Sequence, residues 1–424
     1  MLTFSAPAWL QEEQKAALKK AQEIGLPGIE DESWRYTQLK NFATLGFEKA
    51  PVPKTEPSVP EEVRRFVSGA DYVLYFYNGV YVKKDSHSNM HEGALIVPLS
   101  RALMSAGRVQ ELVRSHLRRE PSSQLKGLGW DNFAHFNDGA FLHIGEDGSG
   151  ETKKVAVIHI HEGAQQPIAT YPRNTFFFGS GASAEILEVH VCASPAVEMQ
   201  VNNSSSWVVS EGARIEVGQI FHLGAETYCF SDTQVRLESQ AVAKFFTLNW
   251  NGRLVRNEQS FVLEGEGAGA EIYGLSLLNS RSHVDCSSCV HHKASATTSR
   301  QLVKNVLMDE SRAVFSGRLI IDPKAQKSDA SQYNANLLLS ERCEADSRPQ
   351  LEISADDVKA AHGATSGQLN EEELFYLQSR GIPCAQAEKI LSLGFQRQVI
   401  EKITSPMIRH GVNSLIQNGE ANHG

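Results

Sequence analysis

Apolar and polar positions alternate along the chain with more than one period. Residues 1–50 and 98–119 space their apolar side chains as an α-helix does. Between about 150 and 340, short runs rich in Val, Ile, Phe and Thr alternate residue by residue, as in Val155–Ile160 and Glu185–Val191. Because the stretches between these runs are too short for crossover helices, the pattern disfavours a doubly wound α/β sheet.

These periods predict a mainly β protein in three parts. An α-rich N-terminal region spans 1–140, a β core spans 141–365, and a C-terminal helical segment spans 366–424. Prolines spaced through Ala50–Pro60 indicate an extended connection inside the first part.

The β core contains a weak internal repeat of Ala, a charged residue and a large apolar residue. It occurs at Ala184–Ile186, Ala213–Ile215, Ala243–Phe245 and Ala270–Ile272, with spacings of 29, 30 and 27 residues. A nearly constant period in strand-rich sequence predicts the stacked coils of a β-solenoid. A β-sandwich or jelly roll remains the structural alternative.

The C-terminal segment carries its own helix signals. Asn370 followed by Glu373 is a capping-box pattern, and this helix should end at Gly381–Pro383. A second helix is predicted from an apolar stripe with a strict spacing of four residues: Ala387, Leu391, Phe395, Val399 and Ile403. From Ser405 onward the chain becomes polar, and we expect a frayed tail.

Composition narrows the class of protein. The net charge of −9 disfavours a nucleic-acid partner, because such proteins concentrate positive charge on one face. No window approaches 18 consecutive apolar residues, so we predict no membrane span. The first residues lack the cationic start and apolar run of a signal peptide, which favours a cytoplasmic location with reduced cysteines.

Two short motifs offer metal chemistry. His159 and His161 would lie on one face of a strand, as in a cupin-like metalloenzyme, although strand histidines are more often structural. Cys286 and Cys289 form a C-x-x-C pair that suits zinc or redox chemistry. A second half of a zinc site is missing, however, and strand residues three apart point to opposite faces. The chain also lacks a P-loop for binding ATP.

Longer motifs resemble a known family, the SufB/SufD family of the SUF iron–sulfur cluster assembly system. The similar segments are Glu32–Thr37, Ser299–Lys304, Ala313–Ile320, Ala325–Ser340, Pro349–Lys359, His362–Thr365 and Leu374–Ile382. The His-Gly-Ala-Thr string at 362–365 is similar to the SufD branch of that family. The resemblance covers both ends of the chain, whereas residues 40–150 carry little of it.

The resemblance implies a fold and a set of partners. The core would be a right-handed parallel β-helix that pairs with a SufB chain through its edges. The C-terminal helices, at about 371–403, would dock the ATPase SufC. The chain would be a scaffold without enzymatic turnover or a tightly bound cofactor, and the complex would hold an iron–sulfur cluster transiently. In isolation the chain could form a homodimer.

The same resemblance singles out His362 as a ligand to the iron of a nascent cluster. SufD proteins often have a cysteine two residues earlier, where this chain has Ala360. Cys286, Cys289 and Cys343 are candidate substitutes for that thiolate. The C-x-x-C segment itself falls where the family has His-x-Asp followed by Val-x-His, a pattern matched by His283, Asp285, Val290 and His292.

Overall fold

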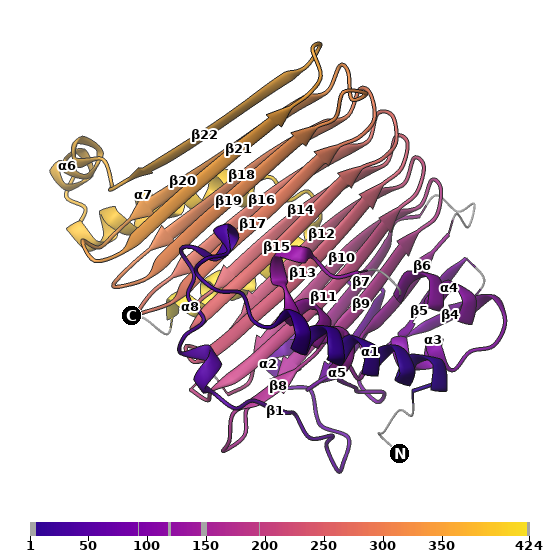
Figure 1. The fold of residues 1–424 in the computed structure, drawn as a ribbon. Helices are drawn as coiled ribbons and strands as arrows, with labels where there is room; N and C mark the ends of the chain where they lie inside the picture. The colour runs from indigo at the N-terminus through magenta and orange to yellow at the C-terminus, as the bar shows by residue number, and fades with distance from the viewer. Residues whose placement is uncertain (1–5, 92, 118–119, 146–150, 195, 422–424) are drawn as a thin grey trace.

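Successive strands in the middle of the chain alternate between two parallel sheets, so that each coil contributes one strand to each sheet (Figure 1). The structure is a computed structural model that describes residues 6–91, 93–117, 120–145, 151–194 and 196–421. Within these residues, about 7 coils stack into a parallel β-solenoid. The predicted mainly β solenoid is therefore confirmed.

The first sheet, called sheet A, contains most of the odd-numbered strands. They are β1 (Glu48–Lys49), β4 (Asn89–His91), β5 (Ala94–Pro98), β6 (Ala140–Ile144), β8 (Ile168–Thr170), β9 (Arg173–Phe178), β11 (Met199–Val209), β13 (Thr227–Leu237), β15 (Leu254–Leu263), β17 (His283–His292), β19 (Arg312–Ile321) and β21 (Glu344–Ile353).

The second sheet, called sheet B, lies opposite. Its strands are β2 (Tyr72–Tyr77), β3 (Val80–Tyr81), β7 (Lys153–His161), β10 (Ser183–Cys192), β12 (Arg214–His222), β14 (Val242–Trp250), β16 (Gly269–Leu278), β18 (Thr298–Leu307), β20 (Asp329–Leu338) and β22 (Lys359–Gly367).

Strand register shows which residues repeat from coil to coil. Ala184 lies beside Ile215, which lies beside Ala243 and then Ala270. The repeat inferred from sequence is thus correct at three positions and wrong at the second. There the equivalent residues are Ile215–Val217, because Ala213 lies before β12 begins.

A turn with a left-handed residue precedes six strands of sheet B, namely β10, β12, β14, β16, β18 and β20. Gly181, Gly212 and Gly267 occupy this position with φ near +70°. The same conformation is adopted by Gln240, Ala296 and Lys327. The amides of these six residues donate to carbonyls of the next coil, so the turns stack as regularly as the strands.

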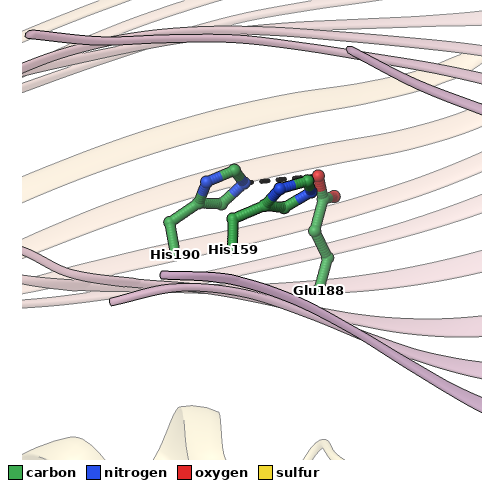
Figure 2. A group of neighbouring side chains, drawn as sticks. All are labelled: His159, Glu188 and His190. Carbon is green, nitrogen blue, oxygen red and sulfur yellow. Dashed lines mark hydrogen bonds and ion pairs between the residues drawn. The ribbon is translucent and has the colours of Figure 1, made fainter. Parts of the chain in front are cut away.

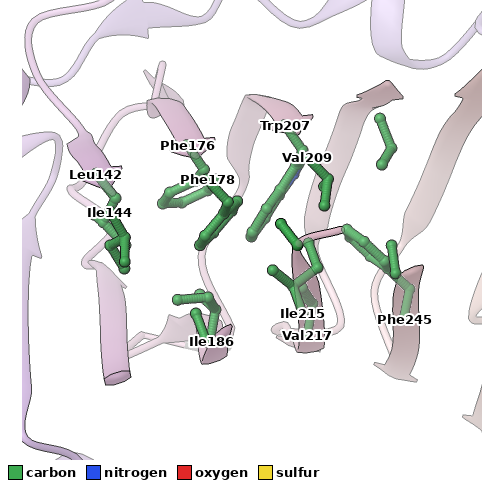
Figure 3. Close-up of a cluster of buried hydrophobic side chains, with 14 of the residues drawn as sticks. Leu142, Ile144, Phe176, Phe178, Ile186, Trp207, Val209, Ile215, Val217 and Phe245 are labelled. Atoms are coloured by element: carbon green, nitrogen blue, oxygen red, sulfur yellow. The ribbon is translucent and has the colours of Figure 1, made fainter. Parts of the chain in front are cut away.

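The solenoid interior has an apolar half that is visible in Figure 3. Phe176, Phe178 and Trp207 project from sheet A toward Ile186 and Phe245 of sheet B, and all five are fully buried. A second apolar cluster, around Val201 and Leu278, fills the opposite edge of the coils. Burial of this kind stabilises a coil only when neighbouring coils are present.

Hydrogen bonds cross the interior between the two apolar halves. The pairs join sheet A to sheet B: Asn174–Glu188 at 2.7 Å, Thr233–Gln219 at 3.2 Å, Asn257–Asn249 at 2.6 Å, Gln259–Thr247 at 2.9 Å, Ser288–Gln301 at 2.6 Å and Ser347–Asn334 at 2.5 Å. A band of buried polar groups therefore runs along the solenoid, and most of its members pair with one another, although atoms such as Asn257 Oδ1 and Gln332 Oε1 have no partner.

The N-terminal elements cover one end of the stack. Helices α1 (Ala8–Ile24), α3 (Leu99–Leu103), α4 (Arg108–Leu117) and α5 (Gly127–His135) gather there with β4 and β5 (Figure 1). The short helix α2 (Glu61–Arg64) leads into β2, which pairs parallel with β7. Strands of the first 140 residues thus belong to the two sheets.

Helices α6 (Glu371–Ser379), α7 (Cys384–Ile400) and α8 (Pro406–Ala421) form the C-terminal segment. The side chain of Asn370 accepts from the amides of Glu372 and Glu373, which confirms the predicted cap. The frayed tail predicted from Ser405 is wrong, because α8 buries Met407 and Ile408 against sheet B. Among the described residues, no helix is both long and apolar enough to cross a membrane.

Candidate functional site

His362 lies on β22, the last strand of sheet B. Its neighbour on β20 is Gln332, whose neighbour on β18 is Gln301, and Gln301 in turn lies beside Ile272 on β16. This column faces the interior along the solenoid, and it changes from apolar to polar over the last coils. Because β22 has a neighbour on one side only, the His362 side chain is exposed. An exposed imidazole at the end of a polar column is accessible to a ligand from outside.

Hydrogen bonds connect the polar residues of this column. The Gln332 side chain donates to Gln301 Oε1 at 2.8 Å, and Gln301 donates to Ser288 Oγ at 2.6 Å. The Gln332 Oε1 atom is buried without a protein partner. It therefore leaves an unused acceptor one strand away from His362.

A second polar column ends at the same open face. Asn305 donates to Asn336 at 2.7 Å, and Asn336 donates to Ser366 on β22 at 2.9 Å. Asn336 also donates to Asn334, the residue that accepts from Ser347. Side-chain hydrogen bonds thus tie the last coil to the stack, in addition to a small apolar cluster that includes Leu351 and Ala355.

The two ends of the solenoid differ. At the N-terminal end, antiparallel pairings of β3 with β2 and of β4 with β5 terminate the sheets. At the C-terminal end, β21 and β22 are the outermost strands, and most of their residues are exposed or half-buried. Two parallel strands of 10 and 9 residues therefore present open edges on the side of His362.

The C-terminal helices divide their apolar residues between the solenoid and the solvent. The predicted stripe packs against this chain itself. Ala387 and Val399 on α7 and Ile403 after its end are buried, and the Lys304 ammonium lies over the Phe395 ring. A partner is therefore not needed to cover that stripe. The exposed apolar side chains are Phe375 and Tyr376 on α6 and Ile390 on α7.

The N-terminal motif at residues 32–37 lies on the outer face of sheet A. Arg256 is fully buried there, with ion pairs to Glu258 and Asp285 and the Trp34 ring 4.7 Å from its guanidinium. Thr37 donates to the same Asp285 carboxylate. The sequence singled out Asp285 and the motif at residues 32–37 separately, but it did not single out Arg256. Arg256 connects the two, and we call this group of buried residues the Arg256 anchor.

The cysteine pair does not form a metal site. Cys286 packs in the interior, while Cys289 lines a cleft on the outer face of sheet A. This confirms that strand residues three apart face opposite ways. Burial and the Asp285 carboxylate raise the pKa of the Cys286 thiol to about 12, which keeps it protonated. Cys343 is buried, and its thiol donates to Ser340.

Both histidines of β7, His159 and His161, are buried in the interior. Figure 2 shows His159 beside Glu188 and His190, two residues that the sequence did not single out. His159, Glu188 and His190 place one potential ligand atom each within 4.8 Å of one another. His161 lies next to this group, with its Nε2 atom 3.2 Å from His190 Nδ1. The coil period carried the missing signal, because position 159 lies beside position 190 in the next coil.

The solenoid, its open end and the polar column that leads to His362 define a class of protein. Comparison with known families identifies that class. A family model described as the SUF system FeS cluster assembly, SufBD core domain, matches residues 159–395. This match spans more than half of the chain, and the chain belongs to the SufBD family.

Individual relatives narrow the assignment to one branch. The iron–sulfur cluster assembly protein SufD of Escherichia coli is 26% identical over 404 residues, which covers 93% of this chain and 89% of that protein. The SufD protein of Bacillus subtilis is 24% identical over 430 residues, covering 97% and 94%. A SufBD family protein of Synechocystis is 25% identical over 417 residues, covering 95% and 89%. The SufD branch expected from the His-Gly-Ala-Thr string is thereby supported.

Proposed function

We propose that this chain is the SufD subunit of a SufB–SufC–SufD scaffold on which iron–sulfur clusters are assembled. The observation that carries the proposal is the open end of the solenoid, where β21 and β22 expose unpaired edges beside His362. Edges of this length favour strand addition by another chain, and a SufB solenoid supplies matching strands. In isolation the same edges are available to a second copy of this chain.

His362 would contribute a neutral imidazole to the iron of the nascent cluster. Imidazole is a competent iron ligand, and the side chain is exposed on the strand that SufB would cover. Ala360, the position where a thiolate is common in this branch, offers no donor. The remaining ligands would therefore come from SufB, and the iron and sulfur are cargo rather than a resident cofactor.

The ATPase SufC would dock on α6 and the exposed side of α7. Phe375, Tyr376 and Ile390 are 71%, 56% and 41% exposed, whereas the other apolar face of α7 is already covered by sheet B. Exposed aromatic side chains are frequent anchors of protein interfaces. The chain itself would have no turnover, so the purified protein should hydrolyse no ATP and release no sulfur from cysteine.

A cupin-like metalloenzyme built on His159 and His161 is the alternative function. A substrate must reach the metal of such an enzyme, and both imidazoles are buried inside the solenoid. We therefore prefer the scaffold.

Co-expression with SufB and SufC of the same organism tests the proposal. Affinity purification followed by native mass spectrometry should reveal one assembly that contains all three chains. The double variant Phe375→Ser/Tyr376→Ser should retain SufB and lose the SufC copy held by this chain. Met104→Ser, which alters an equally exposed apolar residue near α3, is the matched control. His362→Ala should leave the assembly intact and lower its cluster content. A chain that purifies alone in every case would contradict the proposal.

A further inference from the structure

The interior of the first coils holds a carboxylate that is completely removed from water. Glu188 is 0% exposed and accepts three hydrogen bonds, from Asn174 at 2.7 Å, Ser205 at 2.6 Å and Gln219 at 2.8 Å. The Nε2 atom of His190 lies 3.4 Å from Glu188 Oε1. So many donors around one carboxyl group indicate the ionised form. In the described part of the chain, neither lysine nor arginine forms an ion pair with it. A buried charge of this kind needs a cation.

Neutral rings of the neighbouring histidines carry no net charge, so they do not balance the charge of the Glu188 carboxylate. Thr170 Oγ1 lies 2.9 Å from His161 Nδ1, and His161 Nε2 lies 3.2 Å from His190 Nδ1. If Thr170 donates, each histidine passes one hydrogen bond toward Glu188 and the negative charge stays unbalanced. If His161 donates to Thr170 instead, the His190 Nε2 lone pair faces the carboxylate. Either order requires one more positive charge between His190 and Glu188.

His159 adds a third donor at the same place. Its ring stacks on that of His190 (Figure 2), with centroids 4.8 Å apart. Its Nε2 atom lies beside the Asn174 amide that contacts Glu188. The separation of 3.4 Å between His190 Nε2 and Glu188 Oε1 is long for a charge-assisted hydrogen bond. It equals the spacing of about 3.4 Å between ligand atoms of a tetrahedral ion with bonds of 2.0–2.1 Å.

We propose that His159, Glu188 and His190 form a buried structural site for a divalent transition-metal ion, with Zn²⁺ as the ion that fits best. Two imidazoles and one carboxylate are a common donor set for such ions. His161 and Gln219 would hold His190 and Glu188 in place from behind, as outer residues of metal sites do. The site is independent of the proposed function, because it lies in the first coils and His362 lies in the last.

Burial gives this site a particular behaviour. All three side chains are at most 1% exposed, so an ion enters while the coils form rather than through an open channel. A chelator added to the folded protein should therefore remove little metal, whereas unfolding in its presence should remove all of it.

The experiment is to unfold the purified chain in guanidinium with EDTA, remove both, and refold it with Zn²⁺ or Co²⁺. We expect about one ion per chain by mass spectrometry of the metal, retained after dialysis against EDTA. Co²⁺ should add visible absorption bands of a low-symmetry site without a thiolate charge-transfer band. Glu188→Gln keeps the shape of the side chain and should lower retained metal at least tenfold. His292→Gln, at another fully buried histidine, and His362→Ala are controls that should keep the ion.

Two results would overturn the site. A folded wild-type chain that retains no ion after refolding with either metal would assign the missing charge to a proton on His190. Retained Co²⁺ with a thiolate band would place the ion at a cysteine. If Glu188→Gln fails to fold, His159→Gln replaces it, and X-ray absorption of the wild-type zinc form must show two imidazoles.

Discussion

Arg256 is a guanidinium with no exposed surface on the outer side of β15. Its charge is balanced by Glu258 and Asp285, and Trp34 covers its face. Removing one member of such a group leaves the other charges buried without a partner. This residue therefore connects the stability of the solenoid to the position of the N-terminal segment.

Arg256→Ala should lower the free energy of unfolding by about 3–5 kcal/mol, since two buried carboxylates lose their counter-charge. Urea titration followed by circular dichroism measures the change. Arg281→Ala is the matched control, because Arg281 is 73% exposed in its ion pair with Glu310 and should cost no more than about 0.5 kcal/mol. Equal effects of the two substitutions would contradict the anchor.

His292 is buried in the interior between Thr297 and Ser299. Burial lowers its pKa from 6.5 to about 4, because the imidazolium form loses its hydration. In the unfolded chain the ring takes up a proton near pH 6.5. The stability that comes from keeping His292 neutral is thus complete above pH 6.5 and is lost as the pH falls toward 4.

We expect His292 alone to cost the wild-type protein about 2 kcal/mol of unfolding free energy between pH 7 and pH 5. His292→Gln should be less stable at pH 7 and should lose this part of the pH dependence. Urea titrations of both proteins at the two pH values give the comparison. An unchanged pH dependence in the variant would show that another group titrates.

Single residues show what sequence can and cannot predict. The opposite faces of Cys286 and Cys289 follow from strand alternation alone, and the structure bears this out. Glu188 and His190 were not predicted to join His159, because they meet it only after the coil register is known. His362 was identified from a resemblance, and its role remains a proposal.

At the scale of elements, α8 is a packed helix where the sequence predicted a frayed C-terminal tail. The helix rests on β12 at Gly218, where a Cβ atom would come within 2.5 Å of Ile408. The polar residues on its outer face led to the prediction of a frayed tail. Its inner face, however, buries Ile408, Val412 and Leu415. Helical amphipathicity over one short segment is easily hidden by a polar composition.

Ile408→Ala should destabilise the protein by about 2–5 kcal/mol, because it leaves a cavity between α8 and sheet B. Ile390→Ala on α7 removes the same atoms at a position that is 41% exposed, and should change stability by only about 0.5 kcal/mol. Thermal unfolding of both variants measures the difference. A frayed α8 would instead make the two substitutions equivalent.

At the scale of the whole molecule, the solenoid is closed at one end and open at the other. The strand-rich period of about thirty residues favoured stacked coils but left a β-sandwich open, and the family resemblance added the parallel β-helix. The register within it was not fully predictable, as the offset of Ala213 demonstrates, because turn lengths vary between coils. The interior polar band was also beyond prediction, since inward and outward polar residues look alike in sequence.

Amide hydrogen exchange should differ between the closed N-terminal end and the open C-terminal end of the solenoid. Each coil contacts only its neighbours, so opening begins where a neighbour is missing. We expect the weakest protection in β21 and β22 and the strongest in β11 to β16, measured by mass spectrometry of peptides from the isolated chain. Binding of SufB should protect β21 and β22 most. Uniform protection along the chain would indicate a single cooperative unit and contradict this prediction.

The stacking of the turns has a consequence for how such a chain can change in length. The coils from β10 to β20 begin at equivalent left-handed turns, and each presents a similar pair of strand edges to the next coil. A segment of one full circuit can be added or removed while every remaining edge keeps a partner. An odd number of residues inserted inside a strand would instead turn the side chains that follow it in that strand to the opposite face. Chains with this architecture should therefore gain or lose length mainly in whole coils, whereas shorter insertions and deletions should be confined to the turns.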